Sequence, residues 1–107
     1  MKKFVSLMTA LILCVVPCFT LTSCGEKTGY TVGVCQLMEH PSLDQATEGF
    51  TDALNAAMAE AGKTVTIDTQ VAGEANLCTT VINTFTAKKV DLIMANATPA
   101  LLAAASL

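Results

Sequence analysis

The residues best suited to chemistry are polar side chains that follow two apolar, β-branched segments of the sequence. They are Gln36, Glu39 and His40 after the segment 31–37, and Asn96 and Thr98 after the segment 90–95. The carboxylate of Glu39 can hold an ammonium group, and Thr98 at the start of a helix can help to hold a carboxylate. The same residues also fit simpler roles, with Thr98 as a helix cap, Glu39 in solvent and His40 in a turn. These five residues are the candidate ligand contacts.

Patterns of known catalytic sites are absent from the sequence. It contains no G-x-G-x-x-G, P-loop, G-x-S-x-G or H-E-x-x-H motif. His40 is the only histidine, and no serine has a recognisable histidine and acid partner. No cysteine or histidine spacing indicates a metal site, and no cofactor is predicted. We therefore expect no enzymatic activity.

Residues 1–23 have the layout of a lipoprotein signal peptide. Two lysines precede an apolar run over 4–19 that is short for a permanent membrane-spanning helix. The run ends in Leu-Thr-Ser-Cys, which makes Cys24 the predicted site of lipid attachment. An ordinary secretory signal and an uncleaved anchor are the alternatives. With 24–29 as lipidated cysteine and tether, the sequence predicts a protein held by lipid on the extracytoplasmic face of the cell membrane.

The charge balance bears on possible partners. The formal net charge is −3 at pH 7, and it becomes −5 when the two lysines of the leader are removed. An acidic domain is repelled by the phosphates of nucleic acid, so we expect no nucleic-acid partner. Attachment to the membrane would come from acyl chains on Cys24 and not from a basic surface.

Two cysteines, Cys35 and Cys78, remain outside the leader and the lipidation site. Outside the cytosol they could form a disulfide. Cys35 falls in a predicted buried strand and Cys78 in a predicted helix, where a free cysteine behaves as a small apolar side chain. We expect two buried thiols, with a disulfide as the alternative.

The chain alternates between strands and helices after residue 30. Strands are predicted over 31–37, 64–71 and 90–95, because these segments are apolar and rich in β-branched residues. A helix is predicted after the first strand, with Ser42 and Gln45 as a capping box and Gly62 as its stop. A second helix is predicted over 75–87. A third is predicted to begin with Thr98 as N-cap and Pro99 as the first helical residue.

This alternation predicts an α/β fold with a parallel sheet, the strand order 2-1-3 and helices on both faces, which is a three-layer βαβαβα arrangement. In such sheets ligands bind beyond the carboxyl ends of the strands, where the strand order reverses. That position lies between the first and third strands, and the five candidate contacts come directly after these two strands. The sequence ends in the apolar run LLAAASL, and three parallel strands would leave an apolar edge unpaired. We therefore expect an incomplete fold, belonging to a longer protein.

The segments VGVCQLMEHPSLDQATEGFTDAL and VDLIMANATPALLAAA resemble the family of ABC transporter substrate-binding proteins of the tryptophan and tyrosine type. The resemblance implies two α/β lobes of the periplasmic-binding-protein kind, which close around a small ligand and deliver it to an ABC permease. It implies that 30–107 is the first part of the N-terminal lobe. The turns 36–40 and 96–98 would then line the cleft, with Thr98 near a ligand carboxylate. Amino acids, aromatic ones among them, are the implied ligands, with another small organic solute as the alternative.

Two other interpretations fit the same alternation of elements. A flavodoxin-like or receiver-like exported domain has this topology, although Asn96 stands where a receiver needs an aspartate, and Met38 to Pro41 replaces the phosphate loop of a flavodoxin. The chain could also be a truncated remnant without a function of its own. A bound flavin would favour the first alternative, and a stop codon directly after Leu107 would favour the second.

Overall fold

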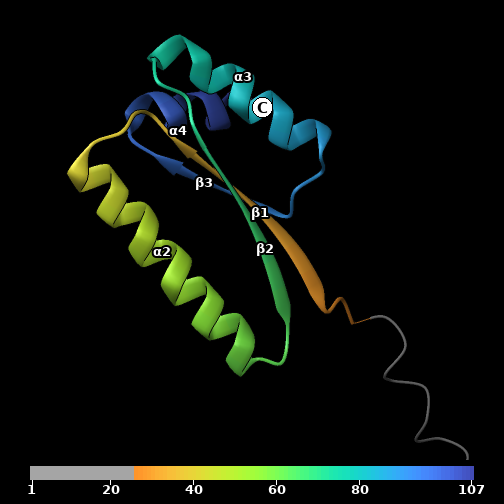
Figure 1. The fold of residues 1–107 in the computed structure, drawn as a ribbon. Coiled ribbons are helices and arrows are strands. Elements are labelled where there is room, and N and C mark those ends of the chain that lie inside the picture. The colour runs from red at the N-terminus through yellow and green to blue at the C-terminus, as the bar shows by residue number, and fades with distance from the viewer. Residues whose placement is uncertain (1–25) are drawn as a thin grey trace, which may run out of the picture.

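The computed structural model describes residues 26–107. The predicted leader and Cys24 lie outside the described residues. The elements follow one another as strand β1 (Gly29–Gln36), helix α2 (Pro41–Glu60), strand β2 (Thr64–Val71), a 3-10 turn η2 (Ala75–Leu77), helix α3 (Cys78–Ala87), strand β3 (Leu92–Asn96) and helix α4 (Thr98–Ala105) (Figure 1). The predicted alternation of strands and helices is confirmed.

The three strands form one parallel sheet in the order β2-β1-β3. The central strand β1 pairs with β2 along its whole length, from Gly29 opposite Thr64 to Gln36 opposite Val71. On its other edge, Gln36 lies opposite Asn96, the last residue of β3. The predicted strand order is therefore confirmed, and β1 and β3 end at the same edge of the sheet.

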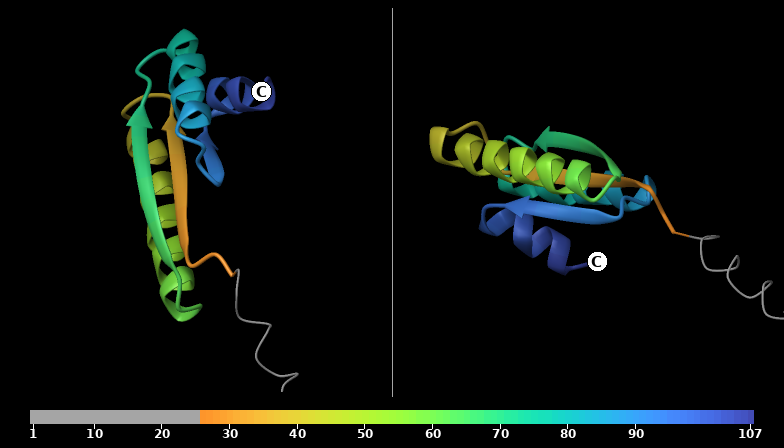
Figure 2. Two further views of the ribbon diagram at one scale, coloured as in Figure 1. Left: turned by 90° about the vertical axis from the view of Figure 1, so that its right-hand side faces the viewer. Right: turned by 90° about the horizontal axis from the view of Figure 1, so that it is seen from below.

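Helices cover both faces of the sheet. Successive side chains of β1 point to opposite sides, so this strand contacts both helical layers. Gln36 reaches α2, where it hydrogen-bonds Thr47. Gly33 faces the opposite side and lies against Phe85 of α3. Figure 1 and Figure 2 show α2 on one side of the strands, and α3 and α4 on the other. The predicted three-layer arrangement is confirmed.

The apolar core lies between the sheet and the pair α3 and α4. It contains the buried residues Cys35, Cys78, Val81, Ile82, Phe85 and Ala100. Phe85 is fully buried, and its ring lies so close to β1 that a Cβ on Gly33 would come within 2.6 Å of it. A glycine is therefore needed at this position for the helix to approach the strand. Helix α2, in contrast, has no fully buried residue.

The predicted capping box of α2 is wrong. The helix begins at Pro41, and the N-cap is His40, whose Nδ1 accepts a hydrogen bond of 3.2 Å from the backbone N–H of Ser42. Proline suits the first helical position because its φ angle is fixed and it has no N–H to satisfy. Ser42 thus lies inside the helix. The predicted stop is confirmed, since Gly62 follows the helix with φ of +69°.

Other boundaries also differ from the sequence-based expectation. The second helix is preceded by the turn η2. Strand β3 begins at Leu92, where its pairing with β1 starts, two residues later than predicted. The predicted N-cap role of Thr98 is wrong, because Thr98 is the first residue of α4 and Ala97 is its N-cap. Within residues 26–107, no helix is both long and apolar enough to cross a membrane.

Candidate functional site

The carboxyl ends of β1 and β3 bring two turns together. The backbone N–H of Leu37 donates to the carbonyl of Asn96 at 3.2 Å, directly after the last residue pair of the two strands. The turn leaving β1 and the turn leaving β3 therefore lie side by side, as Figure 1 shows near the start of α2. We call residues 36–40 and 96–98 the carboxyl edge. All five predicted contacts belong to it.

Two of the five, Gln36 and Asn96, have buried side chains, 2% and 7% exposed. Gln36 Nε2 donates to the carbonyl of Met38 at 2.8 Å and to Asp44 Oδ1 at 2.7 Å. Asn96 Nδ2 donates to the carbonyl of Leu43 at 2.8 Å. Both amides thus hold the carboxyl edge against the first turns of α2. Among the described residues, no donor reaches Asn96 Oδ1, and this atom stays available as an acceptor.

Thr47 links the two amides. Its hydroxyl donates to Gln36 Oε1 at 2.6 Å and accepts from Asn96 Nδ2 at 2.9 Å. Sequence reasoning did not select Thr47, because it lies in the middle of a helical pattern. Thr47 lies seven residues after the N-cap His40, on the helix face toward the sheet. A polar residue on a core-facing stripe needs a hydrogen-bond partner, and this position could have indicated its role.

The other three predicted contacts, Glu39, His40 and Thr98, are exposed. His40 uses Nδ1 to cap α2, which leaves the other ring nitrogen free of that role. Thr98 is the first residue of α4, and no side chain caps the N-terminus of this helix. The carboxyl edge therefore presents a carboxylate, an imidazole, a hydroxyl and the positive end of a helix dipole to its surroundings.

The backbone between Asn96 and Thr98 is strained. Ala97 has φ of 94° and ψ of 157°, a region that glycine occupies and other residues avoid. Strain of this kind costs on the order of 1–3 kcal/mol and persists only where neighbouring contacts impose it. It occurs at the residue that joins the end of β3 to α4.

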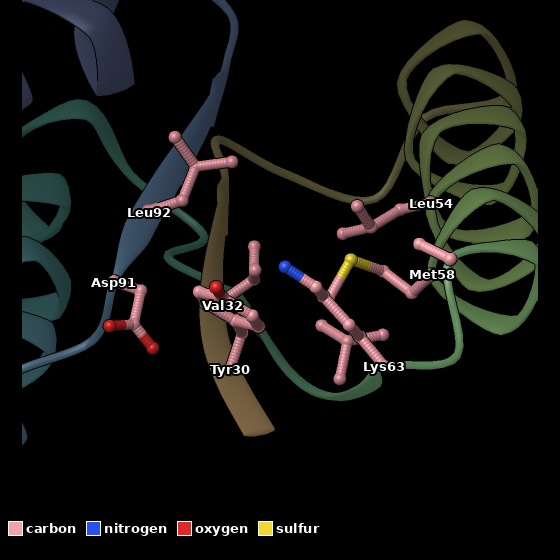
Figure 3. A pocket seen from close by; sticks show the side chains of 9 residues that line it. Tyr30, Val32, Leu54, Met58, Lys63, Asp91 and Leu92 are labelled. Atoms are coloured by element: carbon pink, nitrogen blue, oxygen red, sulfur yellow. The ribbon is translucent and has the colours of Figure 1, made fainter. Parts of the chain in front are cut away.

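A hollow lies at the opposite end of the sheet. It has a volume of about 440 Å³ and lies between α2 and the first residues of β1 and β3. Figure 3 shows Leu54 and Met58 of α2 pointing toward Tyr30 and Val32 of β1. Its lining is Tyr30, Val32, Leu54, Met58, Ala61, Lys63, Val65, Asp91 and Leu92. No sequence pattern had indicated this hollow.

Charged groups surround the hollow. Lys27 pairs with Asp91, and this hydrogen bond, helped by the backbone N–H of Thr31, lowers the pKa of the Asp91 carboxyl. Lys63 pairs with Glu26 at 3.1 Å, and this hydrogen bond raises the pKa of Lys63. These ion pairs lie beside the hollow, and most of its lining between α2 and the sheet is apolar.

Cys35 and Cys78 are both free and fully buried, which confirms the prediction of two buried thiols. Burial, together with the nearby Cys78, raises the pKa of Cys35 to about 12. A thiol that stays protonated is a poor nucleophile. Within the described part of the chain, no cluster of histidine, cysteine or acidic residues could hold a metal ion.

Comparisons with known proteins agree on one family. The family described as ABC transporter substrate binding protein matches residues 31–106. The tyrosine-binding protein of Clostridioides difficile (strain R20291) is 35% identical over 120 aligned positions, which cover 96% of this chain and 34% of that protein. The chain thus spans about a third of the length of this curated relative. No solved structure matches the chain.

Proposed function

Because the chain belongs to the family of ABC transporter substrate-binding proteins, we propose that it serves as the lipid-anchored, extracytoplasmic binding component of an ABC importer for amino acids. It has no catalytic role in this proposal. The observation that carries the proposal is the carboxyl edge, where the turns after β1 and β3 meet. Family membership also removes the flavodoxin-like and receiver-like interpretations.

The position of the carboxyl edge supports a binding role. It lies where the strand order reverses, because β1 is followed by β2 on one side and paired with β3 on the other. Ligands of open α/β sheets bind beyond the carboxyl ends of the strands at such a point. The charges also suit an amino acid, which carries an ammonium group and a carboxylate on one carbon.

Each charge of the ligand has a counterpart at this edge. The N-terminus of α4 and the hydroxyl of Thr98 would receive the carboxylate. Glu39 would hold the ammonium group, and Asn96 Oδ1 offers it a second acceptor. His40 would lie beside the ligand. Gln36 would not reach the ligand itself but would hold the turn after β1 through its hydrogen bond to the carbonyl of Met38. The hollow at the other end of the sheet has no part in this proposal.

The ligand class rests on the curated relative. That protein is described as tyrosine-binding, and it is 35% identical to this chain. Aromatic amino acids are therefore the first ligands to test. Since the relative is about three times as long, we propose that residues 30–107 form the first part of an N-terminal lobe, and that a second lobe completes the cleft. A closed cleft covers most of a ligand, which one open edge cannot do.

Export and anchoring are proposed from the leader. The basic start, the apolar run and Cys24 form a lipoprotein signal. The alignment with the tyrosine-binding protein covers 96% of this chain and so extends into residues 1–25. Acyl chains on Cys24 would keep the binding protein beside its permease.

Substitution Cys24→Ala should abolish incorporation of a radioactive fatty acid, whereas Cys18→Ser, which removes a thiol within the leader, should not.

Calorimetric titration of the protein expressed from its complete gene tests the ligand assignment. A panel of the common amino acids should contain at least one ligand, with an aromatic one binding tightest. Thr98→Val should weaken this binding about tenfold, because a buried ligand oxygen loses a hydrogen bond. Thr66→Val, an exposed threonine of β2 away from the edge, is the matched control and should not. If no amino acid binds, the proposed ligand class is wrong.

A further inference from the structure

We infer that Thr47 is a positioning residue that fixes the turn after β1 and the turn after β3 relative to each other. The inference rests on the proposed function, because it concerns the same carboxyl edge. Thr47 would not touch the ligand. It would act through the two buried amides, Gln36 and Asn96, which its hydroxyl joins.

The geometry gives Thr47 this role. Among residues 26–107, its hydroxyl is the one side-chain group that hydrogen-bonds both strand ends, as donor to Gln36 Oε1 at 2.6 Å and as acceptor from Asn96 Nδ2 at 2.9 Å. A hydroxyl can serve both because it carries one proton and two lone pairs. The amides are nine-tenths buried or more, so water cannot easily replace a lost partner.

The same network reaches both turns. Gln36 Nε2 holds the carbonyl of Met38, which lies in the turn after β1. Asn96 directly precedes the strained Ala97 and the proposed ligand contact Thr98. A shift of either amide would therefore move the turn that follows it.

The strain at Ala97 shows that the turn after β3 is held from both sides. On one side Asn96 is fixed to α2 by Thr47 and by the carbonyl of Leu43. On the other side Ala100 of α4 is fully buried in the core. Between these two fixed points Ala97 keeps a backbone conformation that a free chain would leave. The strained residue then sets the direction of Thr98 and of the first N–H groups of α4.

Binding measurements on three threonine variants test the inference in the protein expressed from its complete gene. Thr47→Val keeps the shape but removes the hydroxyl, and it should weaken binding of the amino-acid ligand about tenfold. Thr47→Ser retains the hydroxyl and should restore binding to within about twofold of the wild type. Thr51→Val is the matched control, because Thr51 lies one turn further along α2 and no hydrogen bond joins it to β1 or β3 among the described residues. It should bind like the wild type.

A fourth variant separates positioning from stability. Ala97→Gly removes the strain, so the melting temperature should rise while the ligand binds more weakly, because the turn becomes flexible. A purely structural role would move stability and affinity in the same direction. This variant decides the question if Thr47→Val does not fold.

These binding measurements distinguish failure of the proposed function from failure of the positioning role of Thr47. If the wild type binds no amino acid, the proposed function fails before the role of Thr47 is tested. If the wild type binds and folded Thr47→Val binds equally well, Thr47 does not position the edge. Weak binding by Thr47→Ser, or tighter binding by Ala97→Gly, would likewise overturn the inference.

Discussion

At the scale of single residues, Gly33 is the point where α3 comes closest to the sheet. An added Cβ would lie 2.6 Å from the ring of Phe85, which is fully buried. Gly33→Ala should therefore destabilise the protein by about 1–3 kcal/mol, the usual cost of overpacking. Urea unfolding followed by circular dichroism measures the loss.

Gly49 provides the matched control. It lies in α2, and a Cβ there would meet nothing within 4 Å. Gly49→Ala should stabilise the protein by about 0.5–1 kcal/mol, because alanine loses less backbone entropy in a helix. Equal effects of the two substitutions would show that the contact of Gly33 with Phe85 is not tight.

The two cysteines should behave as core residues. Cys35 and Cys78 are fully buried, and the pKa of Cys35 is raised to about 12 by burial and by the neighbouring Cys78. At pH 8 both thiols should therefore react with iodoacetamide only slowly in the native protein, and rapidly in urea. Intact mass spectrometry counts the modified thiols. Rapid reaction under native conditions would mean that this part of the core opens.

The side chains of the carboxyl edge were only partly predictable from the sequence. The strand pattern correctly placed Gln36 and Asn96 at the carboxyl ends of neighbouring strands. It could not show that both amides turn toward α2, because the register of the pairing decides which face each side chain takes. Thr47 escaped notice for the same reason, since its partners are distant in sequence.

At the scale of elements, the start of α2 depends on His40. Its Nδ1 accepts the hydrogen bond from the N–H of Ser42 that a serine or aspartate N-cap would usually accept. His40→Ala should cost about 1 kcal/mol of stability, and His40→Asn should recover most of it. Ser42→Ala should change little, because Ser42 is not the cap. A larger loss from Ser42→Ala than from His40→Ala would restore the capping-box prediction.

An ion pair joins the end of α3 to β2 and makes stability depend on pH. Lys88 contacts Asp68 at 2.7 Å, and this hydrogen bond lowers the pKa of Asp68 below its ordinary value of 3.8. The pair therefore stabilises the fold above about pH 4, and the stabilisation is lost as the pH falls toward the lowered pKa. The effect should be small, because exposed pairs contribute at most about 1 kcal/mol.

Melting temperatures between pH 6 and pH 2 measure this dependence. Asp68→Asn should lower the melting temperature at pH 6 and reduce the loss on acidification. Asp52→Asn, on the exposed side of α2, is the control and should do neither. An unchanged acid response in Asp68→Asn would show that the pair does not couple α3 to β2.

Element order and type were readable from the sequence, whereas element ends were less so. The apolar, β-branched segments indicated three strands. The helices between these strands are long enough for crossovers, which indicated a parallel sheet and favoured the order 2-1-3. The ends differed where one residue decides them. Helix α2 begins earlier than predicted, at Pro41, and β3 begins later, at Leu92. Ala97 is the N-cap in place of Thr98.

In the whole molecule, the described residues form a polar carboxyl edge at one end of the sheet and an apolar hollow at the other. The carboxyl edge carries the charged and hydroxyl groups that an amino acid needs. The hollow near Tyr30 and Met58 has a volume of about 440 Å³ and a mostly apolar lining, and its charged lining residues Lys63 and Asp91 are already paired with Glu26 and Lys27. We therefore propose that the ligand binds at the carboxyl edge.

Nuclear magnetic resonance of isotope-labelled protein, expressed from its complete gene and titrated with the tightest-binding amino acid, tests this placement most directly. If the ligand binds at the carboxyl edge, the backbone amide signals of residues 37–40 and 96–98 should shift with saturation, while those of Tyr30, Met58 and Lys63 stay in place. Shifts confined to the residues of the hollow, with the carboxyl edge unchanged, would contradict it.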